Sequence, residues 1–333
     1  MILTENIKRC LVTGGTGFIG TKLLHQLDSI GLEFVLLLRE KKPSYNVEQF
    51  ICDLGVQRIP EEAFDDVDTV FHLAGYAHDI STSKDVDGLY YSLNVDATIE
   101  LATIAAKKNI KRFVFVSSVK AGGSASSGTC ISEDDDEEPD GIYGRTKREA
   151  ELKLLEIGEK YGMHVAILRP ALIYGEGMKG NLKTMLEGVD KGWFPPLPDV
   201  HNRRSMVYID DVIRILLSLA EHDQANGHIY ILTDGQVYTT RDIYEMMSKA
   251  LGKTLPRWNL PEIVLKFGAR IGDLVCDYSG RNFPLNSHSL EKLFGSSWYC
   301  SDKIKRELGY NTTYTFKDAL PKIVEQYRNE IRK

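Results

Sequence analysis

The fold of this chain is decided by the stretch Cys10-Leu11-Val12-Thr13-Gly14-Gly15-Thr16-Gly17-Phe18-Ile19-Gly20. Its apolar start, residues 10–12, predicts a buried strand, and Leu23, Leu24 and Leu27 are spaced as on one face of a following helix. Glycines also mark ordinary turns, but a strand before them and an amphipathic helix after them favour a dinucleotide-binding motif. Such glycines let the backbone approach a pyrophosphate, and free N–H groups at the helix start attract the anion. The residues expected at the dinucleotide are Gly14, Gly17, Phe18, Ile19 and Gly20.

The chain has 333 residues, 43% of them hydrophobic, and a formal net charge of -6 at pH 7. This length suffices for a large core and predicts a large domain with a smaller one. The mild acidity argues against a nucleic-acid partner. The first expected strand comes without a preceding signal-peptide segment, and no apolar run is long enough to span a membrane. We therefore expect a cytoplasmic protein without membrane insertion.

The cysteines are scattered along the chain, and no two of them have C-x-x-C spacing. Their odd number and their dispersion predict neither a disulfide framework nor a zinc or other metal site. Free thiols of this kind are typical of a reducing compartment, in agreement with a cytoplasmic protein. The five cysteines are Cys10, Cys52, Cys130, Cys276 and Cys300.

Strand-like and helix-like segments alternate along the first half of the chain. The expected strands are 10–12, 34–38, 50–52, 69–73, 112–116 and 165–168. Between them, residues 89–107 and 143–161 are expected to form helices, each with an apolar face. This alternation predicts an α/β fold, namely a Rossmann-type doubly wound parallel sheet.

The alternation loosens after Gly175, where Gly and Pro become frequent. Residues 207–220 and 228–232 are expected to return to the sheet, and the chain beyond Thr239 is expected to be mainly helical. The amphipathic helix over 263–275 is predicted to pack against its own domain, with membrane-surface contact as the alternative. The predicted domains are 1–175, completed by about 205–235, for the dinucleotide, and 176–204 with 236–333 for the substrate.

The residue after the second strand distinguishes NAD from NADP. A carboxylate there binds the adenosine ribose hydroxyls of NAD, whereas a guanidinium suits the 2′-phosphate of NADP. Arg39 therefore favours NADP, and Glu40 beside it leaves NAD possible. Since the carboxyl ends of parallel strands meet at one edge, Asp53, Gly75 and Ser118 are expected near the same ligand.

Tyr143 and Lys147 are four residues apart and therefore share one face of the predicted helix. A lysine ammonium near a phenol favours the phenolate, so we expect Lys147 to lower the pKa of Tyr143 from near 10 towards neutrality. Tyr143 would then serve as general acid and base for an alcohol–ketone interconversion, with Ser118 bonded to the same substrate oxygen. Each residue alone has an ordinary structural explanation, but the three together favour catalysis.

An ordered series of motifs runs through nearly the whole chain. It consists of Thr13-Gly14-Gly15-Thr16-Gly17-Phe18-Ile19-Gly20, Asp53-Leu54, His72-Leu73-Ala74-Gly75, Val116-Ser117-Ser118, Tyr143-x-x-x-Lys147, Leu168-Arg169-Pro170, Ile173-Tyr174-Gly175, Tyr208-Ile209-Asp210-Asp211 and Asp302 to Gly309. By this series the chain resembles the extended short-chain dehydrogenase/reductases, a family of NAD(P)-dependent nucleotide-sugar epimerases, dehydratases and reductases. The resemblance implies cofactor contacts from the glycines above, Arg39, Asp53, Leu54, Leu73, Ala74, Gly75, Tyr143, Lys147 and Pro170.

The segments 178–182 and 202–207 resemble those of two groups within this family, the UDP-4-keto-6-deoxy-N-acetylhexosamine 4-ketoreductases and the UDP-hexose 4-epimerases. The planar guanidinium of an arginine suits a diphosphate, so Arg204 is expected there; the alternative is that Arg204 is an ordinary surface arginine in a loop. The substrate contacts so implied are His78 and Ser118 at the sugar, Asn181 and Leu182 at the nucleotide, and Arg204 and Lys292 at the diphosphate.

The resemblance implies chemistry at C4 of a nucleotide-linked sugar. A dehydratase is disfavoured because the extra carboxylates that it needs are replaced by Val119 and Lys120 after Ser118. Arg39 and exchangeable NADPH favour a 4-ketoreductase, and a 4-epimerase with tightly bound NAD is the alternative. A non-catalytic NAD(P)-sensing protein is a remote third hypothesis. The resemblance also implies a homodimer through a four-helix bundle of helices 89–107 and 143–161.

Overall fold

The computed structural model describes residues 6–77, 86–124, 128–135, 137–279 and 286–332. The chain divides into two compact units. Unit 1 comprises Met1–Ala171, Ile209–Thr233 and Tyr299–Thr313, and unit 2 comprises Leu172–Tyr208, Asp234–Trp298 and Tyr314–Lys333.

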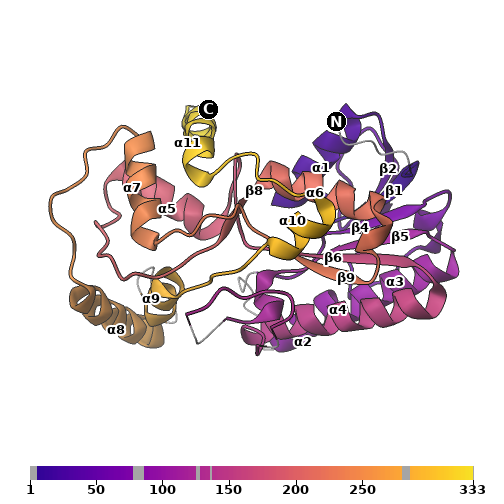
Figure 1. The fold of residues 1–333 in the computed structure, drawn as a ribbon, viewed down its shortest axis with the longest axis horizontal. Helices are drawn as coiled ribbons and strands as arrows, with labels where there is room; N and C mark the ends of the chain where they lie inside the picture. The colour runs from indigo at the N-terminus through magenta and orange to yellow at the C-terminus, as the bar shows by residue number, and fades with distance from the viewer. Residues whose placement is uncertain (1–5, 78–85, 125–127, 136, 280–285, 333) are drawn as a thin grey trace. The chain divides into compact units, whose positions relative to one another are not determined.

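Unit 1 is built on a parallel sheet of seven strands (Figure 1). In spatial order these are β3 (Gln49–Ile51), β2 (Glu33–Leu38), β1 (Arg9–Thr13), β4 (Thr69–His72), β5 (Arg112–Val116), β6 (His164–Pro170) and β9 (His228–Leu232). The strand order reverses between β1 and β4, and ligands of doubly wound sheets bind at such a point, beyond the carboxyl ends of the strands. The predicted α/β fold is confirmed.

Helices cover both faces of this sheet (Figure 1). On one face α1 (Phe18–Ser29) packs against α6 (Ile209–Glu221), and on the other α3 (Ala97–Lys107) packs against α4 (Gly141–Tyr161). Short helical turns complete the unit: η1 (Glu61–Phe64), η3 (Val119–Gly122) and η4 (Asp223–Ala225). The apolar side chains of strands and helices form a continuous buried core, which explains the near-unbroken apolar runs of the strands.

The helix predicted over 89–107 is not continuous. It consists of α2 (Val86–Tyr91), a π-helical turn η2 (Ser92–Asp96) and α3. Within the π turn, the Asn94 side chain bonds to the backbone of Tyr76, accepting from its N–H at 2.7 Å and donating to its carbonyl at 3.1 Å. A π turn of this kind often marks a functional site, because it redirects one side chain without ending the helix.

Two predictions about the later part of the chain are wrong. The strand β8 (Met206–Tyr208), at the start of the stretch expected to return to the main sheet, pairs instead with β7 (Leu172–Tyr174) in a separate two-stranded sheet. The segment Tyr299–Thr313, which we assigned to the smaller domain, belongs to unit 1. Its helix α10 (Asp302–Leu308) packs on β9, where Lys303 donates to the Ile229 carbonyl at 3.0 Å.

Unit 2 is mainly helical. Its helices are α5 (Gly180–Lys191), α7 (Thr240–Ala250), α8 (Glu262–Ser279), α9 (Ser287–Phe294) and α11 (Phe316–Ile331). α7 packs against both α5 and α11, while α8 packs against α9. Among the residues described, no helix combines the length and the apolar character needed to cross a membrane.

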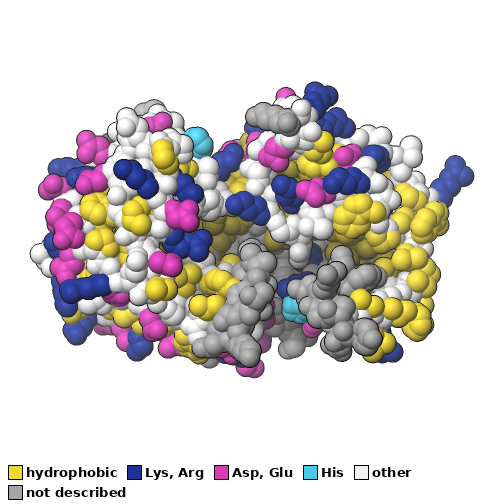
Figure 2. Space-filling view, turned by 180° about the vertical axis from the view of Figure 1, so that it is seen from behind, with side chains coloured by type: hydrophobic (Ala, Val, Ile, Leu, Met, Phe, Trp, Pro, Cys, Tyr) yellow, Lys and Arg dark blue, Asp and Glu magenta, His cyan; other side chains and the backbone are white. Residues whose placement is uncertain are grey.

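The helix over 263–275 packs against its own domain as predicted, since α8 contacts α9 in unit 2, but most of its large apolar side chains stay exposed. Only Leu265, Ala269 and Gly272 are buried on the described part of α8, whereas Phe267 is 66% exposed. Figure 2 views the molecule from behind, with α8 at the lower right, and hydrophobic side chains gather there at the surface. An apolar face is thus left uncovered in unit 2.

Candidate active site

The turn after β1 is held open for a ligand by its glycines. Gly14 has a φ of +69°, and a Cβ at this position would lie 2.6 Å from the backbone nitrogen of Ala74. A Cβ at Gly20 would overlap the Gly14 carbonyl oxygen, so the first turn of α1 packs directly on the loop. Gly17 is the N-cap of α1, and no described side chain caps its N–H groups. This cradle, which any side chain would fill, fits the pyrophosphate of a dinucleotide.

The other expected cofactor residues follow the carboxyl ends of neighbouring strands in unit 1. After β4, the Ala74 N–H donates to the Thr13 hydroxyl at 3.2 Å, which joins this turn to β1. Arg39 directly follows β2 and is exposed. The remaining ones are Leu73 and Gly75 after β4, Asp53 and Leu54 after β3, and Pro170 at the end of β6.

Ser118 and Tyr143 come together from two different elements. Ser118 follows β5 as the N-cap of η3, and Tyr143 lies in the first turn of α4. The two side chains share a hydrogen bond. Gly144 makes this approach possible, because a Cβ there would overlap the Lys120 carbonyl oxygen in η3. The residues predicted for catalysis are therefore adjacent in the structure.

Lys147 lies one turn further along α4 and is buried. Its Nζ donates to the Val116 carbonyl at 3.0 Å and lies 4.4 Å from the centroid of the Phe115 ring. Burial lowers the pKa of Lys147 to about 8, opposed by the nearby carboxylate of Glu151. The amine is thus fixed beneath the end of β5, next to Gly75, where a Cβ would lie 3.1 Å from Nζ.

The expectation that Lys147 brings the Tyr143 pKa towards neutrality is wrong for this structure. Burial raises the pKa of Tyr143 to about 12, and the hydrogen bond with Ser118 offsets this only in part. The physical reason is the burial of the phenol, to which Tyr90 and the carboxylate of Glu151 add smaller unfavourable effects on the phenolate.

The residues expected at the substrate lie in unit 2, apart from Ser118 and from His78, which is outside the described residues. Asn181 and Leu182 are in the first turn of α5, the former exposed and the latter buried. The Arg204 guanidinium donates to the Thr240 hydroxyl at 3.2 Å and to the Lys292 carbonyl. Arg204 and Lys292 are thus brought together.

The chain is similar to proteins of a known enzyme family. Residues 10–232 match the model of the NAD dependent epimerase/dehydratase family. The chain belongs to this family. The family resemblance inferred from the sequence motifs is confirmed, and the chain is an enzyme of the family, either an epimerase or a dehydrogenase.

Two curated relatives of this epimerase/dehydratase are sugar 4-epimerases. The UDP-glucose 4-epimerase of Vibrio cholerae is 30% identical over 76% of this chain and 78% of its own. The N-acetyl-alpha-D-glucosaminyl-diphospho-ditrans,octacis-undecaprenol 4-epimerase of Escherichia coli O157:H7 is 24% identical over 95% of this chain and 94% of its own. The solved UDP-glucose 4-epimerase of Thermotoga maritima has the same fold, with a TM-score of 0.77 at 22% identity, covering 97% of this chain and 99% of that one.

Asn94 is a site residue that our sequence reasoning missed. Besides its bonds to Tyr76, its amide donates to the Thr146 hydroxyl at 3.1 Å, beside Lys147 on α4. It also faces Gly75, where a Cβ would lie 3.1 Å from its Oδ1. A lone asparagine within an apolar helical segment was the available signal, because such a buried amide needs several partners.

The buried ion pair of Glu151 and Arg169 was also missed. Its two hydrogen bonds measure 2.9 and 2.6 Å, and both side chains are almost fully buried. Glu151 is one turn beyond Lys147 on α4, and Arg169 precedes the final residue of β6. The pair therefore joins α4 to the sheet.

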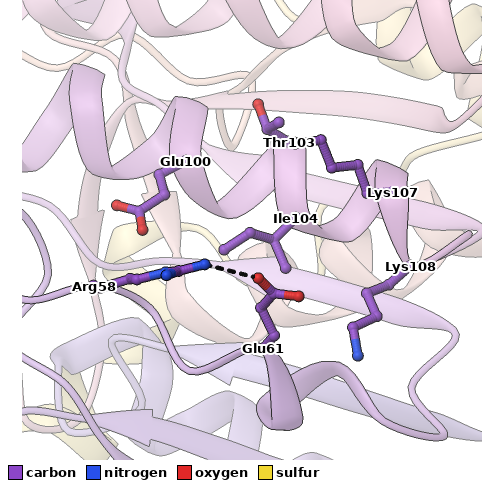
Figure 3. A pocket seen from close by; sticks show the side chains of 7 residues that line it. All are labelled: Arg58, Glu61, Glu100, Thr103, Ile104, Lys107 and Lys108. Carbon is purple, nitrogen blue, oxygen red and sulfur yellow. Dashed lines mark hydrogen bonds and ion pairs between the residues drawn. The ribbon is translucent and has the colours of Figure 1, made fainter.

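A cavity of about 350 Å³ in unit 1 has no part in this site (Figure 3). It lies between η1 and the second half of α3, and an ion pair of Arg58 and Glu61 at 3.2 Å borders it. None of the residues expected at the cofactor or the substrate lines it. Among the residues that the structure describes, no cluster of His, Cys, Asp or Glu is arranged to hold a metal ion.

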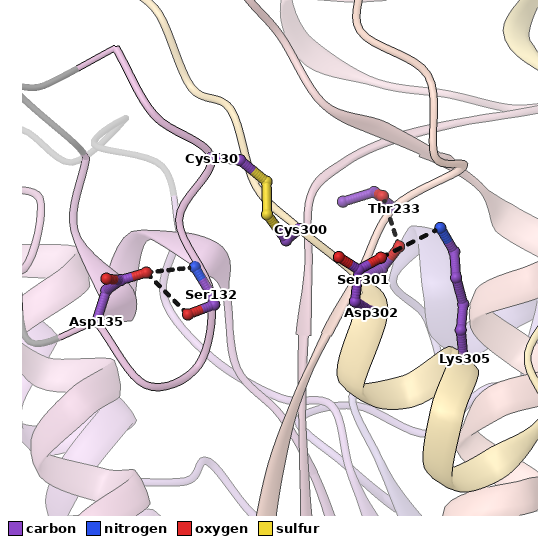
Figure 4. The surroundings of a disulfide bond; sticks show 8 residues. All are labelled: Cys130, Ser132, Asp135, Thr233, Cys300, Ser301, Asp302 and Lys305. Atoms are coloured by element: carbon purple, nitrogen blue, oxygen red, sulfur yellow. Dashed lines mark hydrogen bonds and ion pairs between the residues drawn. A yellow bond between two sulfur atoms is a disulfide. The ribbon is translucent and has the colours of Figure 1, made fainter.

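A disulfide joins Cys130 to Cys300 in unit 1, with Cα atoms 5.6 Å apart (Figure 4). The prediction that the cysteines form no disulfide is therefore wrong, and the argument from free thiols to a reducing compartment loses its basis. The pair lies where the Cys300 N–H donates to the Ile131 carbonyl at 2.7 Å. The bond thus fastens the segment after η3 to the chain before α10.

Proposed function

We propose that this enzyme is a 4-epimerase of a diphosphate-linked sugar, which retains one NAD through the whole reaction. The geometry supports it through one observation: Ser118 and Tyr143 are hydrogen-bonded to each other at the same sheet edge as the glycine cradle. Both curated relatives described above are 4-epimerases, which favours this function over the 4-ketoreductase that ranks first on sequence grounds.

Each residue has a definite task in this proposal. The glycine cradle and the start of α1 would hold the pyrophosphate of the dinucleotide, which would supply reversible hydride transfer at C4 when bound. Ser118 orients the C4 oxygen, while Tyr143 takes its proton and gives it back. Lys147 holds the end of β5 under the cofactor site through the Val116 carbonyl. The Ser118 hydrogen bond favours the deprotonated Tyr143, because it lowers the pKa of the phenol.

We propose NAD as the resident cofactor. The family description names NAD, and solved structures of the same fold contain it, including a UDP-glucose 4-epimerase from Thermus thermophilus. Arg39 remains the feature that favours NADP, and it is exposed and followed by Glu40, which pairs with Lys42 at 3.6 Å. An adenosine ribose with free hydroxyls fits a carboxylate at this strand end.

The substrate class is a sugar carried on a diphosphate. Arg204 and Lys292 supply two cationic side chains from neighbouring segments of unit 2. The group beyond the diphosphate differs between the relatives, which are named for uridine in one case and undecaprenol in the other. Both classes of substrate share the sugar diphosphate that these cations recognise.

A deuterium label at C4 tests this function against the reductase. An epimerase returns the abstracted deuteride to the same carbon, so the C4 epimer formed from 4-deuterated UDP-sugar keeps its label without added NAD(P)H. Tyr143→Phe should abolish that product. Consumption of NADPH with a 4-keto sugar, and no interconversion of the labelled substrate, would show a reductase instead.

A further inference from the structure

The strongest feature outside the active site is the exposed apolar face of α8. The helix runs over Glu262–Ser279, and six large hydrophobic side chains are exposed among those that the structure describes, Ile263 at 76%. The six are Ile263, Val264, Phe267, Ile271, Leu274 and Val275. Trp258, four residues before the helix, is 62% exposed as well. Soluble monomers rarely leave such a contiguous patch uncovered without a partner for it.

The helix is divided into two faces by its 3.6-residue period. Leu265, Ala269 and Gly272 form the buried stripe, at spacings of four and three residues. The exposed hydrophobic residues occupy an adjoining arc of about 120° when each residue advances about 100°. This larger apolar arc is thus distinct from the stripe by which α8 packs on the protein.

Cations follow one edge of the apolar arc. Lys266 and Arg270 are one turn apart and exposed, and they lie between the arc and the carboxylates of Glu262 and Asp273. Lys266 pairs with Glu262 at 2.6 Å, while Asp273 accepts from Ser287. Both carboxylates therefore have partners within unit 2. Arg270 thus adds a positive charge to this edge beyond the Lys266–Glu262 pair, and Asp277 falls at the same edge by the period of the helix.

We propose that this face of α8 docks unit 2 onto the surface of an anionic lipid bilayer. Apolar side chains with an aromatic residue, bordered by Lys and Arg, are what a helix needs to lie in the interfacial plane of a membrane. The apolar arc enters the acyl boundary, and Lys266 and Arg270 remain at the level of the anionic headgroups. The helix lies on the membrane and does not cross it. This inference does not depend on the proposed epimerase activity.

Vesicle sedimentation of the full-length chain tests the proposal. We expect binding to vesicles of mixed phosphatidylcholine and phosphatidylglycerol, and much weaker binding to phosphatidylcholine alone. The double variant Phe267→Ser with Ile271→Ser should lower the partition coefficient at least about tenfold, because two large side chains lose their burial in lipid. Arg270→Glu should weaken only the binding that depends on anionic lipid. Val56→Ser, at an exposed site in unit 1, is the matched control and should bind as the unchanged protein does.

All these positions are exposed, so the variants should fold and keep their activity on a water-soluble nucleotide sugar. Failure of the unchanged protein to sediment with either vesicle would overturn the proposal, as would equal binding of the Phe267→Ser, Ile271→Ser variant. Self-association that this variant abolishes, in a protein that ignores vesicles, would show that a second copy covers the face instead.

Discussion

The Nζ of Lys147 donates a hydrogen bond to the carbonyl of Val116 at 3.0 Å, two residues before Ser118. This bond joins α4 to the end of β5, from which the segment carrying Ser118 begins. It also places a titrating amine in the interior, beside the ring of Phe115. Lys147 is thus a support of the active site as well as a candidate cofactor contact.

The buried amine makes stability depend on pH in a defined direction. Lys147 has a pKa of about 8 in the fold against 10.5 for the free side chain, so the folded protein loses this proton first. The free-energy cost of burying the charged ammonium lowers stability fully below pH 8, and it disappears as the pH rises towards about 10. The free energy of unfolding should therefore rise by about 2 kcal/mol relative to that of Lys147→Met. Urea unfolding of the unchanged protein and of Lys147→Met over this pH range measures the difference. Free energies of unfolding that change with pH in parallel in the two proteins would contradict it.

Tyr143→Phe removes the proton donor and keeps the ring in its place. We expect turnover to fall at least about a hundredfold, the usual contribution of a positioned general acid or base. Bound dinucleotide, measured by mass spectrometry under native conditions, should be unchanged. Tyr161→Phe, at the exposed C-terminal end of α4, is the control and should keep full activity. Near-normal turnover of Tyr143→Phe would remove Tyr143 from the mechanism.

Gly144→Ala tests the close approach of α4 and η3. Alanine normally stabilises a helix by up to about 1 kcal/mol relative to glycine, but here its Cβ meets the Lys120 carbonyl. Relief of this overlap moves η3 away from Tyr143 and takes Ser118 with it. We expect the rise in activation free energy, calculated from kcat, to exceed the loss in the free energy of unfolding. Arg145→Ala, at the exposed neighbouring position, should change neither quantity, and a more stable and fully active Gly144→Ala protein would disprove the contact.

The disulfide predicts how many thiols react. Alkylation of the unfolded, unreduced protein should modify three cysteines, namely Cys10, Cys52 and Cys276, and prior reduction should raise the number to five. Mass spectrometry counts the added groups. Reduction should also lower the melting temperature, because the bond closes a loop between residues 170 positions apart. Five reactive thiols without reductant would show that the pair is not joined.

Local patterns predicted the elements of unit 1 and the adjacency of Ser118 and Tyr143. β5 lies over Arg112–Val116 as predicted, because an apolar run between polar ends fixes a buried strand locally. Ser118 and Tyr143 could be placed together since strand ends meet at one sheet edge.

Features that depend on distant partners escaped this reasoning. The interruption at Asn94 depends on the backbone of Tyr76, and the Cys130–Cys300 bond on a neighbour far along the chain. For α8 the periodicity identified an apolar face, but a period carries no information on whether that face is covered. The pKa of Tyr143 depends first on the burial of its phenol, which the spacing of Tyr143 and Lys147 does not specify.

Identifying the dinucleotide bound to the purified enzyme tests the central claim most directly. The protein, denatured after purification without added nucleotide, should release NAD in a one-to-one ratio, and before denaturation it should interconvert C4-epimeric UDP-sugars without any added NAD(P)H. Release of NADP or of no dinucleotide, together with turnover only when NADPH is supplied and consumed, would contradict the epimerase and establish a reductase.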